Sequence, residues 1–178
     1  MRPIRARTLL TAAVLACATG AAAVDMNPHL APLAPLVGKT WRGTVSPPGA
    51  AKPAVDVSRF ELALNGQAVR NRHSIDDGVY GGETFIVWEE ARQSLVYYYF
   101  TTAGFYTTGT MRAEDGAIVS HEVIKGAAGG ISEVKAVSRL LPDGRLHVKS
   151  RHLKNGQWED GRETFYVEDP LAVVRFKE

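Results

Sequence analysis

Cysteine is almost absent from this sequence. The 178 residues contain one, Cys17, in an N-terminal stretch that we expect to be removed. The chain that remains can form no disulfide, no thiolate metal site and no cysteine nucleophile. A chain without cysteine suits the oxidising periplasm.

Long hydrophobic runs are scarce as well. The run over residues 9–18 is too short to cross a bilayer as a helix. It follows three arginines and precedes the tripeptide "AAA" that ends at Ala23, which is the layout of a secretory signal peptide. The sequence therefore predicts a signal peptide over residues 1–23 and a periplasmic or secreted protein with no transmembrane segment. As an alternative, "VLA" before Cys17 loosely resembles a lipoprotein cleavage box, and one lipid would tether the protein to a membrane.

An excess of positive charge is missing from the mature chain. Removal of the signal peptide leaves 18 Lys and Arg against 19 Asp and Glu, a net charge of −1 with the histidines neutral. We therefore expect no nucleic-acid partner. By length, residues 24–178 form a single domain.

Helical periodicity is also missing. From Val57 to Val167 no apolar stripe repeats at helical spacing over three turns, and short alternating segments lie between turn residues instead. This pattern predicts an all-β fold with strands near 39–46, 57–64, 67–75, 80–89, 94–102, 105–113, 117–125, 131–141, 145–154 and 157–168. Because the connections are short, neighbours should pair antiparallel, and closure removes the two exposed edges. We expect an up-and-down antiparallel β-barrel of about 8–10 strands.

The segment "LAPLVGKTWRGTV" resembles the opening of the calycin superfamily, the lipocalins and fatty-acid-binding proteins. Gly38 is followed closely by Trp41, here with two intervening residues where that superfamily usually has one. The resemblance extends over the mature chain, above all to secreted lipocalin-like bacterial families of unestablished function. It implies a short N-terminal helical turn over one barrel end and a cavity for a ligand.

The first hairpin can be placed from its turn. With Asn65 and Gly66 at the tip, Leu62 faces Val69, and Glu61 opposes Arg70 on the outside. The same register turns Asn71 and His73 toward the interior.

Three consecutive tyrosines, 97–99, require aromatic side chains on both faces of a strand. With Ala103 and Gly104 as the hairpin tip, Tyr98 points inward opposite Gly109. Tyr97, Tyr99 and Tyr106 then form an outer aromatic patch.

Inward positions collect polar side chains that need partners when they are buried. The candidate ligand-binding residues are Asn71, His73, Glu83, Tyr98, Ser150, His152 and Glu163, with Glu83 and Glu163 in the related segments "GGETFIV" and "GRETFYV". Two hypotheses stay open: a closed polar network with water, or a cluster that orients a small, largely apolar ligand. No arginine is assigned to the inner face, so the sequence does not indicate a site that would bind the carboxylate of a fatty acid.

Two other functions stay open. An enzyme could use His73 or His152 with Glu83 as an acid–base pair, but the sequence has no serine elbow, no HExxH and no phosphate-binding glycine loop. The two histidines lack metal-ligand spacing, and haem ligation by one of them has no support, so we expect neither a metal nor a cofactor. An envelope interaction protein could use the outer tyrosines or the tail "DPLAVVRFKE". We expect a monomer or a weak homodimer.

Overall fold

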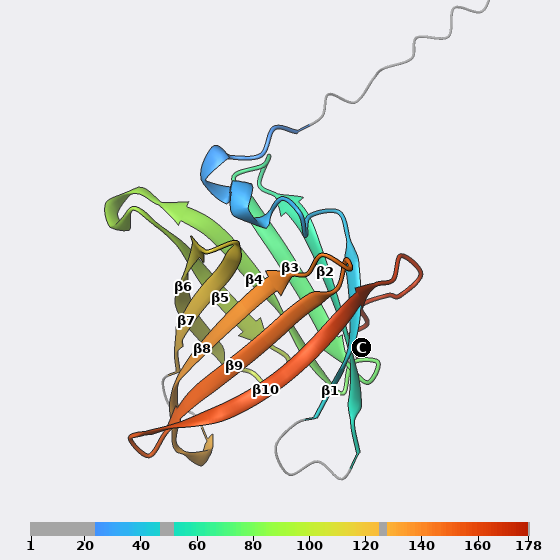
Figure 1. Cartoon of the computed structure of the whole chain (residues 1–178), viewed down its shortest axis with the longest axis vertical. Coiled ribbons are helices and arrows are strands. Elements are labelled where there is room, and N and C mark those ends of the chain that lie inside the picture. The colour runs from blue at the N-terminus through green and yellow to red at the C-terminus, as the bar shows by residue number, and fades with distance from the viewer. Residues whose placement is uncertain (1–23, 47–51, 125–127, 178) are drawn as a thin grey trace, which may run out of the picture.

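Ten antiparallel strands form a closed barrel in the computed structural model, which describes residues 24–46, 52–124 and 128–177 (Figure 1). Each strand pairs with its sequence neighbours, and the first pairs with the last. The strands are β1 (Thr40–Val45), β2 (Ala54–Ala63), β3 (Ala68–Ile75), β4 (Tyr80–Glu89), β5 (Ser94–Thr101), β6 (Tyr106–Glu114), β7 (Ala117–Val123), β8 (Ile131–Leu140), β9 (Leu146–Lys154) and β10 (Gln157–Glu168). The predicted all-β up-and-down barrel is confirmed. The predicted signal peptide, with Cys17, lies outside the described residues.

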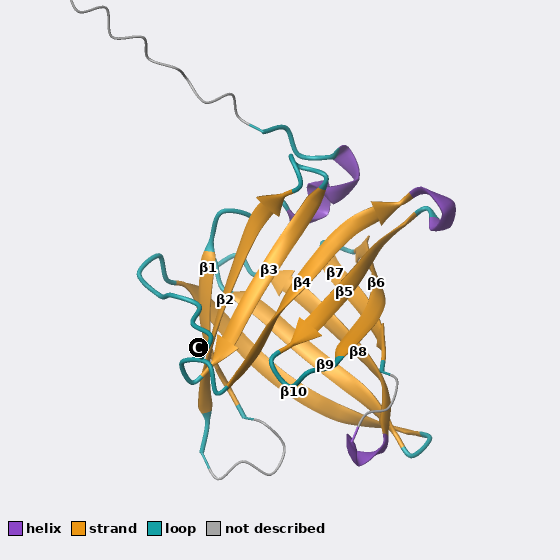
Figure 2. Cartoon of the chain, turned by 180° about the vertical axis from the view of Figure 1, so that it is seen from behind, coloured by secondary structure: helices purple, strands orange, loops and turns teal. Residues whose placement is uncertain are grey.

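One end of the barrel is covered by the 3-10 helix η1 (Pro28–Leu33), purple in Figure 2. The Asn27 side chain caps it by accepting a hydrogen bond from the His29 backbone N–H, and Pro28 occupies its first turn. Leu30 and Leu33 are buried and belong to the same core cluster as Trp41. The apolar core therefore lies under this end of the barrel.

Two further 3-10 helices are single turns. They are η2 (Glu90–Arg92), between β4 and β5, and η3 (Ala128–Gly130), before β8. In the part of the chain that the structure describes, no helix is long and apolar enough to cross a membrane.

The β2–β3 hairpin has the predicted register. Leu62 pairs with Val69, and Glu61 pairs with Arg70, whose Nε donates to the Glu61 carboxylate at 2.9 Å. The turn at Asn65, which has a φ of +53°, was therefore a reliable signal.

The β5–β6 hairpin differs from the prediction by one residue. The Thr101 amide donates to the Phe105 carbonyl at 3.0 Å, which leaves a three-residue loop over 102–104. Gly104 ends this loop with a φ of +82°, a conformation that favours glycine. The two-residue tip predicted for this hairpin is wrong.

Because of this one-residue shift, the side chains of β5 that were predicted to point inward point outward, and those predicted outward point inward. Tyr97 pairs with Gly109 and is 4 % exposed, whereas Tyr98 pairs with Thr108 on the outside and is 47 % exposed. The predicted outward orientation of Tyr97 and Tyr99 and the inward orientation of Tyr98 are both wrong.

The tail after β10 lies against the outside of β3 and β4. The Arg175 amide donates to the Ser74 hydroxyl at 3.1 Å, and the Phe176 ring lies 5.2 Å from the Arg72 guanidinium. Leu171 is 89 % exposed. The expected packing of the tail on the barrel therefore holds for its last residues only.

Candidate functional site

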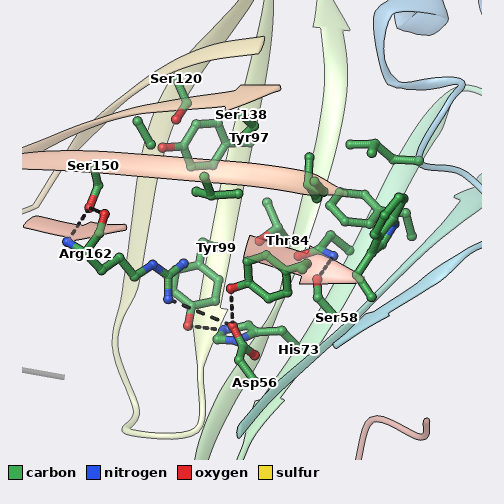
Figure 3. A pocket seen from close by; sticks show the side chains of 18 of the residues that line it. Asp56, Ser58, His73, Thr84, Tyr97, Tyr99, Ser120, Ser138, Ser150 and Arg162 are labelled. Carbon is green, nitrogen blue, oxygen red and sulfur yellow. Dashed lines mark hydrogen bonds and ion pairs between the residues drawn. The ribbon is translucent and has the colours of Figure 1, made fainter. Parts of the chain in front are cut away.

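The barrel encloses a cavity of about 390 Å³, within the range of small-molecule sites (Figure 3). Inward side chains from all ten strands line it. The apolar part of the lining consists of Leu36, Trp41, Phe60, Ile75, Met111, Val134, Ala136, Leu146 and Val148. Hydroxyl, carboxyl, carboxamide, imidazole and guanidinium groups line the rest, so the cavity is markedly more polar than the sequence suggested.

His73 is the centre of a chain of hydrogen bonds in this cavity. Its Nδ1 lies 3.1 Å from the Asp56 carboxylate, and its Nε2 lies 2.7 Å from the Tyr99 hydroxyl. The Tyr80 hydroxyl, 3.1 Å from that of Tyr99, ends the chain. Figure 3 shows Asp56, His73 and Tyr99 converging from β2, β3 and β5.

The direction of each hydrogen bond in this series follows from which atoms can only accept. A carboxylate can only accept, so Nδ1 of His73 donates to Asp56. In a neutral imidazole Nε2 then accepts from Tyr99. If His73 takes up a proton, Nε2 must donate to Tyr99, and the Tyr99 hydroxyl turns to Tyr80. One proton on His73 therefore reverses the two bonds beyond Nε2 and leaves the bond from Nδ1 to Asp56 unchanged.

Asp56 is almost fully buried and is held as a carboxylate by its neighbours. Burial by itself would raise its pKa, but hydrogen bonding to His73 and Tyr166, with the charges of His73 and Arg162, holds that pKa below its usual range. The Tyr166 hydroxyl donates to Asp56 at 2.8 Å, and the Arg162 guanidinium lies 3.9 Å away.

Arg162 lines the cavity, contrary to the sequence analysis, which assigned no arginine to the inner face. The pairing of β10 with β9 shifts register between Asp160 and Glu163, and this bulge changes which residues face inward. The Ser150 hydroxyl fixes the bulge by accepting from the Arg162 amide at 3.0 Å and donating to the Arg162 carbonyl at 3.2 Å.

A second set of interacting residues lies in one row across β5, β6 and β7. Tyr97 pairs with Gly109, and Gly109 pairs with Glu122. Since Gly109 has no side chain, the Tyr97 ring extends across it, and its hydroxyl donates to the Glu122 carboxyl at 3.3 Å. Burial raises the pKa of Glu122 above its usual value and raises that of Tyr97 as well.

Three of the predicted site residues line the cavity: Asn71, His73 and Ser150. Asn71 donates to the Ser58 hydroxyl at 2.6 Å. His152 does not line the cavity, and its Nε2 lies 3.3 Å from Glu159. The sequence therefore found part of the polar lining but not the grouping of its members.

The other three predicted site residues lie outside. Glu83 pairs with Arg72 at 2.9 Å on the outer face, because the register of β3 and β4 places Thr84 inward instead. Glu163 lies 2.8 Å from His147, because the β10 bulge turns it outward. Tyr98 is outward because of the three-residue loop between β5 and β6.

The exposed aromatic patch also has a different composition from the one predicted. Tyr106 is exposed as expected, but Tyr97 and Tyr99 point inward. The outer side chains are Tyr98, Phe100, Phe105 and Tyr106, and the rings of Phe100 and Tyr106 have centroids 5.9 Å apart.

Among residues 24–46, 52–124 and 128–177, no three His, Cys, Asp or Glu side chains group as a metal site would require. The lining of the cavity includes two separate carboxyl groups, Asp56 on β2 and Glu122 on β7.

Comparison with known proteins supports the fold. No protein-family model matches the chain, and no curated protein matches it. Among solved structures the chain is similar to the crystal structure of Rv2717c from M. tuberculosis, with a TM-score of 0.58 and 17 % sequence identity. The match covers 82 % of this chain and 99 % of that chain. At this identity the likeness establishes a common barrel fold only.

Proposed function

We propose that this protein is a periplasmic or secreted binding protein that holds a small molecule with a largely apolar body inside its barrel. The observation that carries the proposal is the cavity of about 390 Å³, with an apolar part beside Trp41 and a polar part around His73. Apolar walls with a few placed polar groups are the usual design of a small-molecule site.

The resemblance to the calycins supports the same function. Helix η1 lies over one barrel end, and Gly38, with a φ of +81°, turns the chain into β1 ahead of the buried Trp41. In that superfamily such a barrel encloses a ligand. The compartment follows from the predicted signal peptide, with lipid attachment at Cys17 as the alternative.

The proposal can be tested by filling the cavity. Ala136 lines the cavity on β8, whereas its neighbour Val137 is 41 % exposed on the outer face. We expect Ala136→Phe to abolish binding of the neutral fluorescent probe prodan, and Val137→Phe to leave it unchanged. If Ala136→Phe does not fold, as judged by circular dichroism, Ser138→Leu fills the same cavity. Failure of the native protein to bind prodan or other neutral apolar probes would overturn the proposal.

A second candidate function is acid–base catalysis. It is favoured by the contact of His73 with a carboxylate on one ring nitrogen and a phenol on the other. The orienting carboxylate would be Asp56 and not the predicted Glu83, which lies on the outer face. Hydrolysis of nitrophenyl acetate, lost in His73→Ala and retained in His152→Ala, would favour this function over simple binding.

A further inference from the structure

Glu122 is a carboxyl group inside the barrel that forms no ion pair with any residue that the structure describes. It lines the cavity on β7, and no ion pair found among the described residues includes it. Its hydrogen bond from the Tyr97 hydroxyl, at 3.3 Å, is long for an O–H···O bond. Carboxylates removed from water are normally paired with a positive group. Half-buried Glu122 has no such pair among the described residues.

No charged group of the described cavity forms an ion pair with Glu122, although the positive charge of Arg162 acts on it from a greater distance. His73 is engaged by Asp56 and Tyr99, and the one guanidinium of the lining, that of Arg162, lies 3.9 Å from Asp56. Two carboxyl groups, those of Asp56 and Glu122, therefore line the described cavity with one guanidinium, which forms its ion pair with Asp56. A cavity of this composition favours a ligand that brings one positive charge.

The surroundings of Glu122 suit a protonated nitrogen. Ser120 shares the inner face of β7 with Glu122, and its hydroxyl lines the cavity as a further acceptor. The aromatic rings of Tyr97 and Tyr99 also line the cavity, and aromatic faces attract cations. Figure 3 shows the Tyr97 ring with Ser120 and Ser138 beyond it, on strands across the barrel from Asp56.

We propose that Glu122 is the counter-ion for the bound molecule, and that the ligand class is a lipophilic amine carried as its ammonium form. The proposal rests on the proposed binding function and adds the charge of the ligand to it. The ammonium group would donate to Glu122 and Ser120, while the apolar body would occupy the part of the cavity near Trp41.

The test uses three probes that share one ring system and differ in charge: naphthylmethylamine, naphthalenemethanol and naphthoic acid. Calorimetric titration at pH 7 gives the affinity of the native protein for each. We expect the amine to bind about tenfold or more tightly than the alcohol, since a charge-assisted hydrogen bond is stronger than a neutral one. Glu122→Gln should remove this preference and keep the affinity for the alcohol.

Matched variants separate this effect from general electrostatics. Glu83→Gln removes a carboxylate from the outer face and should leave the preference for the amine intact. Glu122→Asp keeps the charge, one methylene further back, and should retain part of that preference. Circular dichroism of each variant establishes that the barrel is folded.

The outcomes distinguish the two proposals. Equal binding of amine and alcohol, or an amine preference that survives in Glu122→Gln, would overturn the role of Glu122 while leaving the binding function in place. Tightest binding of naphthoic acid would also overturn it and would direct attention to Arg162. Absence of binding by all three probes would overturn the binding function itself, and the amine proposal with it.

Discussion

The Tyr99 hydroxyl lies 2.7 Å from Nε2 of His73, so the imidazole makes one hydrogen bond to a phenol and another to the carboxylate of Asp56. Of the described histidines, only His73 has a hydrogen-bond contact at both ring nitrogens. The described histidines at positions 121, 147 and 152 each contact one glutamate through Nε2.

His73→Ala should therefore be much more destabilising than His152→Ala. The first change removes one hydrogen-bond partner from buried Asp56 and one from half-buried Tyr99, and it should lower the free energy of unfolding by about 2 kcal/mol. The second removes a contact with an exposed glutamate and should cost less than about 1 kcal/mol. Urea unfolding followed by circular dichroism measures both, and equal losses would contradict the assignment of His73 to the central chain.

Asp56 and Glu122 should respond to mutation in opposite directions. The pKa of Asp56 is lowered in the fold, so its stabilisation is present above its unfolded pKa of about 3.8 and is lost as the pH falls. Asp56→Asn should destabilise by about 3 kcal/mol at pH 7, and the difference should shrink in acid.

For Glu122 the sign is reversed. Its pKa is raised by burial, so the fold is most favoured while this carboxyl is protonated, below its unfolded pKa of about 4.5, and it loses stability as the pH rises through the folded pKa. Glu122→Gln should therefore raise the melting temperature at pH 7 and have little effect in acid. A lower melting temperature in Glu122→Gln at pH 7 would show that the carboxylate already has a compensating partner.

Half of the tyrosines should resist ionisation. Burial raises the pKa of Tyr97, Tyr99 and Tyr166 well above the ordinary value of 10.0, and the sequence has six tyrosines in all. An ultraviolet titration should show these three ionising late, together with unfolding, because a raised pKa removes stability as the pH rises past 10. Each of the three Tyr→Phe variants should lose one late-titrating group. Tyr98→Phe is the outward control, and loss of a late group in it would contradict the orientation of β5.

Gly109→Ala should displace the Tyr97 ring. A Cβ at position 109 would lie 2.5 Å from the Tyr97 hydroxyl oxygen, and it would also collide with the backbone of β7. We expect a loss of about 2 kcal/mol in unfolding free energy and a changed cavity. Thr108→Ala, the outward neighbour on β6, should change stability by less than about 0.5 kcal/mol. Comparable losses in the two variants would rule out the close approach of Tyr97 to Gly109.

The mature protein should begin at Val24. Intact-mass measurement after cell fractionation should find this species in the periplasmic or secreted pool, because residues 1–23 have the layout of a signal peptide. An acylated mass starting at Cys17 would select the lipoprotein alternative. The full-length chain in the cytoplasm would refute export.

The strands could be predicted from the sequence because turn residues separate them at regular intervals. Asn65 with Gly66, for example, defines both the β2–β3 turn and the register of its strands. The sequence also placed Ser150 of β9 on the inner face, where the structure has it.

The site was harder to predict because one extra residue in a loop or a strand changes which side chains of that strand point into the barrel. Thr101 and Phe105 close a three-residue loop that looks in sequence like a two-residue turn at Gly104, and the difference moves Tyr98 outside. Because of the β10 bulge, Arg162 lines the cavity and the predicted Glu163 does not. Gly161 beside that bulge was the one available signal, since isolated glycines within strands often accompany bulges.

The seam of the barrel joins its first strand, β1, to its last strand, β10. Trp41 on β1 pairs with Glu168 on β10, so the ring of hydrogen bonds needs a strand from near each terminus. Contacts so distant in sequence form slowly, because the intervening chain must first lose its freedom. During synthesis the barrel cannot close before its last strand has emerged. A chain that has to stay unfolded until it has crossed a membrane would gain from that delay, and truncation within β10 should leave an open sheet with exposed edges.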